Sequence, residues 1–95
     1  MLNQLFDVIK DRKTHPQAGS YTNQLLQAGT DAILQKVGEE SVEVILAAKG
    51  QGKQRLVEEI SDLFYHSLVL LVDQGISLDE IETELARRHT TPKER

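Results

Sequence analysis

The chain has 95 residues, no cysteine and a formal net charge of −4. This length corresponds to one domain with one small core, which association with a second copy would help to stabilise. The absence of cysteine excludes disulfides, thiol catalysis and cysteine-ligated zinc. The negative charge argues against a general nucleic-acid binder, and no apolar run is long enough to cross a bilayer. Because the N-terminal segment also lacks the features of a signal peptide, we expect a soluble cytoplasmic protein.

The spacing of apolar residues predicts helices, and no strand alternation persists anywhere. The helices are predicted over residues 2–13, 21–28, 31–49, 53–74 and 78–88. Ser20 is the expected N-cap of the second helix, and Thr30 or Asp31 of the third. Ser77 and Glu80 have the spacing of a capping box at the start of the last helix. These signals predict an all-α fold, an antiparallel bundle of about four to five helices in a single domain over residues 1–95.

The fourth predicted helix becomes apolar on every side from Leu68 to Val72. A helix of that kind has to be covered on most sides, and one short chain offers few covering helices. We therefore expect the bundle to be completed by dimerisation, with this helix near its centre. The polar residues 89–95, which include Pro92, are expected to form a loose tail.

Two pairs of carboxylates flank the break between helices at residues 50–52. Glu40 and Glu43 are three residues apart, which places both side chains on one face of a helix. Glu59 and Asp62 have the same spacing, and the two pairs stand equally far from the break. If the segment folds back as a hairpin, Glu43 meets Glu59 at one level. Glu40 then meets Asp62 at the next.

Acidic residues on helices usually form a solvated face. Here Glu40 lies on the apolar stripe of its helix, and Glu59 lies at the edge of the next stripe. Both acids are therefore expected at the seam between helices, where carboxylates destabilise the fold unless they are paired or bound to a metal. The pattern alone supports a metal site and a solvated face about equally.

Ligation by carboxylates, without Cys or clustered His, suits Mg²⁺, with Mn²⁺ as a substitute. Mg²⁺ favours phosphate oxygens, so a polyphosphate substrate is a reasonable extension. In such a site the metal would activate a water and neutralise charge on the leaving pyrophosphate. A remaining carboxylate would act as base toward that water.

Several other side chains have two interpretations. Lys36 either reaches a phosphate or is solvated, and Tyr21 either packs or binds a base or hydroxyl; the sequence leaves both open. Gly38, inside a helix, is better explained by a close helix contact than by access for substrate. His66 is better explained as a hydrogen-bonded seam residue than as a catalyst. Arg88 suits the negative end of its helix and is also a good phosphate partner.

The run Lys36-Val37-Gly38-Glu39-Glu40, with Glu43, Glu59 and Asp62, resembles the motif of the MazG-like nucleoside triphosphate pyrophosphohydrolases. That motif is two adjacent Glu, two residues, Glu, a variable gap, then Glu, two residues, and Asp or Glu. Further blocks narrow the resemblance to the phosphoribosyl-ATP pyrophosphohydrolases, which act in the second step of histidine biosynthesis. These blocks are Ser20-Tyr21-Thr22, Gly29-Thr30, Ser61-Asp62-Leu63, Tyr65-His66 and Arg88-His89.

The resemblance covers about Leu5 to His89 and implies a MazG-like bundle, a homodimer or higher homo-oligomer. It implies Mg²⁺-dependent hydrolysis of 1-(5-phosphoribosyl)-ATP to 1-(5-phosphoribosyl)-AMP and pyrophosphate, by a stand-alone form without a fused cyclohydrolase. The implied metal ligands are Glu40, Glu43, Glu59 and Asp62. The implied catalytic residues are Glu39, as a further ligand or the base, with Glu40 and Lys36. The implied substrate-binding residues are Tyr21, Thr22, Lys36 and Arg88.

Two alternatives stay open at this point. A housecleaning pyrophosphohydrolase of the same superfamily shares the metal site and differs only in blocks that contact the substrate, such as residues 20–22. A non-catalytic helical dimerisation module, whose acids are a solvated face, belongs to a different class. It predicts no stabilisation by divalent cations and no phosphohydrolysis. In the enzyme interpretations the partner is a small-molecule nucleotide, and neither nucleic acid nor a membrane is expected.

Overall fold

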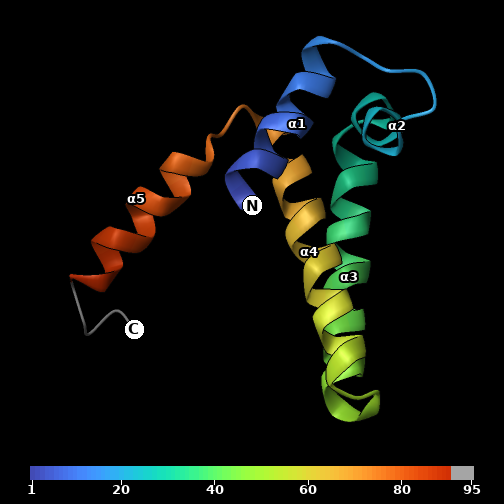
Figure 1. Cartoon of the computed structure of the whole chain (residues 1–95), viewed down its shortest axis with the longest axis vertical. Helices are drawn as coiled ribbons and strands as arrows, with labels where there is room; N and C mark the ends of the chain where they lie inside the picture. The colour runs from blue at the N-terminus through green and yellow to red at the C-terminus, as the bar shows by residue number, and fades with distance from the viewer. Residues whose placement is uncertain (91–95) are drawn as a thin grey trace.

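The computed structural model describes residues 1–90, and these residues form five α-helices and no strand. The helices are α1 (Leu2–Thr14), α2 (Tyr21–Ala28), α3 (Thr30–Gly50), α4 (Lys53–Gln74) and α5 (Leu78–His89). α3 and α4 form a long hairpin, and α1 and α2 pack against one end of it (Figure 1). The prediction of an all-α helical bundle is therefore confirmed.

Most of the predicted helix ends agree with the structure. The Ser20 hydroxyl accepts a hydrogen bond from the backbone N–H of Asn23 and caps α2. Ser77 and Glu80 form the predicted capping box at the start of α5. Gly75 ends α4 in the left-handed conformation, at φ +71°, which glycine adopts without steric penalty. Each of these signals is local, so each can be recognised in the sequence alone.

The predicted cap of α3 is wrong. Gly29 occupies the N-cap position, and neither Thr30 nor Asp31 caps the helix with its side chain. The Thr30 hydroxyl instead donates a hydrogen bond, 2.7 Å long, to the Asp73 carboxylate near the end of α4. A partner 43 residues away in the chain outcompetes the local cap because the hairpin brings the two helix ends together.

The apolar core lies at the end of the hairpin that α1 and α2 cover. We call this part of the molecule the covered end. Its buried side chains are Phe6, Ile9, Leu25, Ile33, Leu68, Val69 and Val72. The rest of the hairpin, residues 40–50 of α3 and 53–64 of α4, extends beyond α1 and α2 as a pair of helices (Figure 1). We call this pair the acidic arm.

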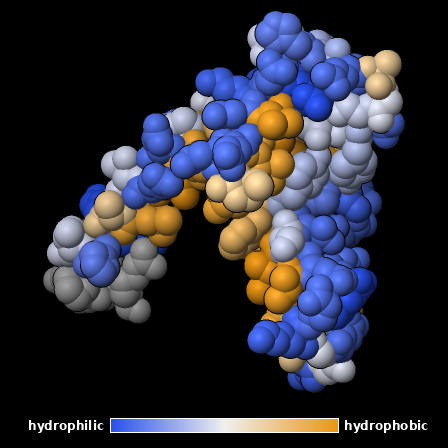
Figure 2. Space-filling model, in the orientation of Figure 1, coloured by the Kyte–Doolittle hydropathy of each residue, from blue (hydrophilic) through white to orange (hydrophobic). Residues whose placement is uncertain are grey.

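α5 leaves the covered end at an angle and does not run along the hairpin (Figure 1). The angle between α4 and α5 contains a groove of about 500 Å³, lined by Phe64, Leu68, Leu71, Leu78, Ile81 and Leu85 among others. Figure 2 shows hydrophobic surface on both sides of this angle. The apolar stretch from Leu68 to Val72 thus packs against α1, α2 and α3, whereas Leu70 and Leu71 line the groove and are only partly buried.

The end of the chain is described as far as Thr90. His89 is the last residue of α5, and the Thr90 hydroxyl donates to the carbonyl of Arg87. The rest of the predicted tail, residues 91–95, lies outside the described residues. Within residues 1–90, no helix combines the length and apolar character that spanning a membrane requires.

Candidate functional site

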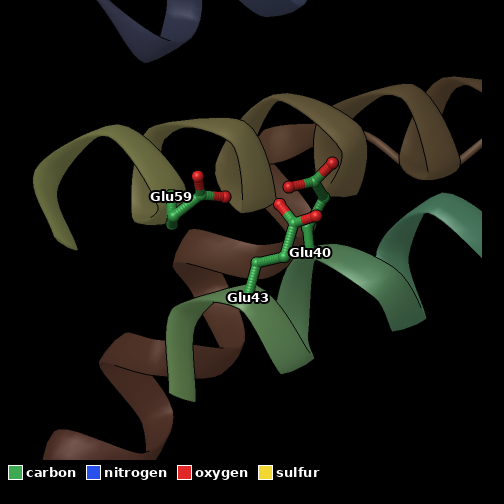
Figure 3. Close-up of side chains that lie close together, drawn as sticks. All are labelled: Glu40, Glu43 and Glu59. Atoms are coloured by element: carbon green, nitrogen blue, oxygen red, sulfur yellow. The ribbon is translucent and has the colours of Figure 1, made fainter. Parts of the chain in front are cut away.

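The hairpin brings three glutamates together across the seam of the acidic arm. Glu40 and Glu43 lie one turn apart on α3 and point toward α4, which carries Glu59 (Figure 3). One carboxylate oxygen from each residue lies within 4.8 Å of the others. The sequence spacing predicted this convergence, and the structure confirms it for these three residues.

Glu40 and Glu59 are both buried, whereas Glu43 is exposed at the edge of the seam. Each buried glutamate uses one oxygen, Oε1, in an ion pair on its own helix. The other oxygen, Oε2, is buried in both residues and has no hydrogen-bond partner among residues 1–90. A buried carboxylate oxygen without a partner is destabilising, so this pair of oxygens indicates a place for a positively charged ligand.

The two ion pairs come from Lys36 on α3 and Arg55 on α4. Lys36 Nζ lies 3.7 Å from Glu40 and 3.6 Å from Glu39. Arg55 lies closer to its partner, with 2.9 Å between a guanidinium nitrogen and Glu59 Oε1. Each cation therefore pairs with one oxygen of a buried glutamate on its own helix, and the other oxygen of each glutamate stays without a partner among residues 1–90.

Proximity and burial shift the pKa values of the three acids. Close contact with the Glu43 carboxyl and then burial raise the pKa of Glu59 to about 7. Burial, followed by the contact with Glu43, raises the pKa of Glu40. The close contacts of Glu43 with Glu59 and then with Glu40 lower the pKa of Glu43. Carboxylates this close disfavour full ionisation of the cluster, so a cation that balances their charge would stabilise it.

Asp62 is near the cluster but does not join it. Its side chain is exposed, and it is not in the group of three ligand atoms within 4.8 Å. Its charge nevertheless raises the pKa of both Glu40 and Glu59. The sequence predicted two contacts across the hairpin, Glu43 with Glu59 and Glu40 with Asp62. The first contact is present. Glu40 instead contacts Glu43, and Asp62 affects Glu40 only through its charge. The assignment of Asp62 as a metal ligand stays a prediction.

Two other predicted site residues lie outside the cluster. Glu39 is exposed and accepts a hydrogen bond from Gln35 on the same helix. Its role as a further ligand or as the base stays a prediction. Arg88 lies on α5 and donates to Glu84 at 2.8 Å. The structure does not bring Arg88 to the acids within this chain, so its predicted substrate contact is also open.

Tyr21 and Thr22 begin α2 and both bind side chains of α4. The Tyr21 hydroxyl lies 3.0 Å from Nε2 of His66, and the Thr22 hydroxyl is hydrogen-bonded to that of Tyr65. His66 is buried, and its Nδ1 donates to the Asp62 carbonyl at 2.8 Å. The sequence interpretation of His66 as a hydrogen-bonded seam residue is confirmed. The substrate contacts predicted for Tyr21 and Thr22 stay predictions.

Gly38 does not mark a close helix contact in this chain. A Cβ built on it would meet no atom within 4 Å among the described residues, and the residue is exposed. The preferred sequence interpretation, tight packing of helices, is therefore wrong for this chain. The opening beside Gly38 leaves room for another molecule on this side of α3.

Sequence reasoning missed Arg55. Its spacing of four residues from Glu59 and three from Glu58 is the ordinary signal for ion pairs along a helix, and the structure contains both pairs. The signal did not stand out because such pairs on helix surfaces usually contribute little. Only the burial of Glu59 makes this cation part of the site.

The cluster fits a hard divalent cation. Three carboxylates from two helices, two of them with an unpartnered buried oxygen, match the oxygen ligands that Mg²⁺ takes. The exposed position of Glu43 leaves one side open to solvent, where water and phosphate oxygens would complete the coordination of such an ion. The alternative to a metal site was a solvated acidic face, and it does not account for two glutamates that are buried in the seam.

Comparison with known proteins identifies the family. The family model for phosphoribosyl-ATP pyrophosphohydrolase matches residues 2–89. The chain belongs to the phosphoribosyl-ATP pyrophosphohydrolase family. It is 56% identical over 88 residues to a phosphoribosyl-ATP pyrophosphatase of Listeria monocytogenes serotype 4b, which covers 93% of this chain and 84% of the relative. It is 54% identical to a phosphoribosyl-ATP pyrophosphatase of Lactiplantibacillus plantarum, over 92% of this chain and 82% of that protein.

Other relatives are longer than this chain. The histidine biosynthesis bifunctional protein HisIE of Caldanaerobacter subterraneus subsp. tengcongensis is 52% identical over 89 residues. That match covers 94% of this chain and 43% of the bifunctional protein. The chain thus spans less than half the length of this relative and most of the length of the other two.

Proposed function

We propose that this chain hydrolyses 1-(5-phosphoribosyl)-ATP to 1-(5-phosphoribosyl)-AMP and pyrophosphate in the cytoplasm, with Mg²⁺ as cofactor and Mn²⁺ as a substitute. The reaction is the second step of histidine biosynthesis. Family membership supports the reaction. The observation that carries the metal requirement is the pair of buried, unpartnered oxygens of Glu40 and Glu59 beside Glu43.

Each side chain has a proposed task in cleaving the anhydride between the α- and β-phosphates. Glu40, Glu43 and Glu59 would hold the cation, with Asp62 at the edge of the site. Mg²⁺, when bound, neutralises phosphate charge and lowers the pKa of a coordinated water. Lys36, half-buried beside Glu40, would add positive charge toward the leaving pyrophosphate. Glu39 is exposed next to the cluster and would take a proton from the attacking water.

The direct test supplies phosphoribosyl-ATP, ATP and dUTP in parallel with Mg²⁺. We expect hydrolysis of phosphoribosyl-ATP to exceed that of the other two, with pyrophosphate as the shared product. Preference for a plain nucleotide would assign the chain to a housecleaning activity instead. Absence of hydrolysis with all three would contradict the enzyme assignment.

A thermal melt with Mg²⁺ tests the cofactor separately. A ligand that binds only the native state raises stability by about 2.7 kcal/mol at a concentration of 100 times its Kd. We expect Mg²⁺ to raise the melting temperature of the wild type, and to raise it much less in the E40Q variant. Equal shifts in both proteins would remove Glu40 from the metal site.

We also propose that the active form is a homodimer, or a higher homo-oligomer built from it, in which a second copy covers the acidic arm and the groove beside α5. The arm has exposed apolar side chains, among them Ile45, Leu46, Val57 and Phe64. Two such helical pairs would complete a four-helix bundle. Sedimentation showing a stable monomer at micromolar concentration would contradict this arrangement.

A further inference from the structure

The contact between α2 and α4 determines whether the hydroxyl of Tyr21 donates or accepts hydrogen bonds. Tyr21 is the first residue of α2, and its ring stacks on that of Tyr65 with 6.2 Å between centroids. Its hydroxyl lies 3.0 Å from Nε2 of the buried His66. The residue is still 47% exposed, so one side of the phenol remains available to a ligand.

The direction of the Tyr21–His66 hydrogen bond follows from the other nitrogen of the imidazole. His66 Nδ1 lies 2.8 Å from the backbone carbonyl of Asp62, which can only accept. Nδ1 therefore carries a hydrogen, and in an imidazole with one hydrogen Nε2 is an acceptor. Tyr21 must then donate its only hydrogen to His66. Burial raises the pKa of Tyr21, which keeps that hydrogen on the phenol.

A phenol that has donated its hydrogen offers only lone pairs to solvent. Tyr21 can therefore accept a hydrogen bond from a ligand, and it cannot donate one to a phosphate oxygen. The hydroxyl is bound to His66, which lies one helical turn from Asp62 and donates to its carbonyl. The Tyr21 hydroxyl therefore lies beside the cluster that would hold the phosphates, and the charges of Lys36, Glu40 and Asp62 act on it. In a nucleoside triphosphate the donors nearest the α-phosphate are the hydroxyls of the ribose that carries the phosphates.

We propose that Tyr21 accepts a hydrogen bond from a ribose hydroxyl of the substrate, on the ribose that carries the triphosphate, and that His66 is the positioning residue that holds the phenol in this accepting orientation. The proposal rests on the proposed function, since it names a contact made by the same substrate. It gives Tyr21 a specific chemistry, recognition of a hydroxyl, where the sequence left packing, a base and a hydroxyl open.

The test combines protein variants with substrates that lack one hydroxyl. Phosphoribosyl-ATP is compared with its 2′-deoxy and 3′-deoxy forms, altered in the triphosphate-bearing ribose, on the wild type and on Y21F. A neutral hydrogen bond of about 1 kcal/mol corresponds to about a fivefold change. In the wild type we expect kcat/KM for one deoxy form to be about fivefold lower than for the unmodified substrate, mainly through a higher KM. In Y21F the deoxy form and the unmodified substrate should have the same kcat/KM. If Y21F distinguishes the same substrates as strongly as the wild type does, the ribose contact is wrong.

The role of His66 is tested by a double-mutant cycle with H66Q and H66L. If His66 acts through Tyr21, each variant lowers the discrimination against the deoxy substrate in the wild-type background and changes nothing further in Y21F. If the His66 variants lower kcat/KM by the same factor in the wild-type and Y21F backgrounds, His66 has a structural role only. Y65F is the matched control, because it removes a neighbouring phenol hydroxyl that binds Thr22, and it should keep the discrimination.

These outcomes are separable from the proposed function itself. The wild-type rate on unmodified phosphoribosyl-ATP reports whether the enzyme assignment holds. If that rate is high and Tyr21 shows no hydroxyl preference, the reaction stands and the positioning of Tyr21 falls. Melting temperatures of H66Q and H66L report folding, and H66Q serves where H66L is too unstable to purify.

Discussion

The two ends of the α3–α4 hairpin have opposite patterns of burial. At the covered end the most buried side chains are apolar, as in Ile33 and Val69, both 0% exposed. In the acidic arm Glu59 is 2% exposed and Glu40 is 6% exposed, whereas Ile45 is 58% exposed and Phe64 is 51% exposed. Two carboxylates are thus inside the arm, together with the small side chain of Ala47, whereas large apolar side chains such as Ile45 and Phe64 are exposed on its outside.

The difference shows that the two ends have different physical requirements. The covered end is stabilised by removing apolar surface from water, and it contains its own covering helices, α1 and α2. The arm contains buried acids that destabilise it unless a cation balances them, and its outer apolar surface has no cover within residues 1–90. The proposed cation in the seam and the proposed second copy on the outside would meet these two requirements of the arm.

The largest effect is expected where the arm loses its carboxylates. E40Q and D62N should each lower the rate of phosphoribosyl-ATP hydrolysis more than about 100-fold, because ligand loss exceeds the 10- to 100-fold effect typical of residues that merely support ligands. The fold should remain, and the melting temperature without metal should hold or rise, because a neutral amide relieves repulsion. Near-normal turnover of either variant would remove that residue from the mechanism.

Truncating apolar residues should separate the two ends. I33A should lower the free energy of unfolding by about 2–5 kcal/mol, because it leaves a cavity in the covered end. I45A should change it by less than about 0.5 kcal/mol in a monomer, because its side chain is exposed. Chemical denaturation at several protein concentrations measures both. In a dimer, I45A should also weaken association, whereas equal losses from both variants at every concentration would contradict the comparison.

The pH dependence of stability should come mainly from the arm. The pKa of Glu59 is about 7 in the folded chain against 4.5 as the ordinary value, so the folded state holds this proton more strongly. The stabilisation is complete below pH 4.5 and is lost as the pH rises through 7. The pKa of Glu43 is lowered from its ordinary value of 4.5. Its contribution to stability is therefore present above pH 4.5 and is lost as the pH falls through the lowered pKa. In EDTA the wild type should melt at lower temperature at pH 8 than at pH 5, and E59Q should show a flatter profile. Parallel profiles would exclude Glu59 as the cause.

The smallest effect is expected at Gly38. Alanine is favoured over glycine inside a helix by about 0.5–1 kcal/mol, and the open space at this position admits a Cβ. G38A should therefore raise the melting temperature slightly. If substrate uses the opening, KM should rise while kcat changes little. A destabilised G38A would indicate a close contact with a second copy, which sedimentation of the variant would reveal.

Much of this protein was determined by the sequence itself. The five helices, the capping box at Ser77, and the convergence of Glu40, Glu43 and Glu59 all depend on spacing along the chain. Helical periodicity and a single break at residues 50–52 are sufficient to place residues on one face and to fold that face back on itself. The family motif lies on the same spacing, so the family could be named before the fold was known.

Only the tertiary structure decided the rest, because it depends on distances between segments and on exposure to water. The Thr30 hydroxyl bonds to Asp73 and does not cap its own helix, and the Tyr21 hydroxyl bonds to His66, which is 45 residues away in the chain. Asp62 stays outside the three-carboxylate group, although it is three residues from Glu59, the same spacing as between Glu40 and Glu43. Burial alone turns Arg55 from an ordinary surface cation into a partner of Glu59. Periodicity reports which face a residue occupies, whereas solvent exclusion by neighbouring helices decides how its charge behaves.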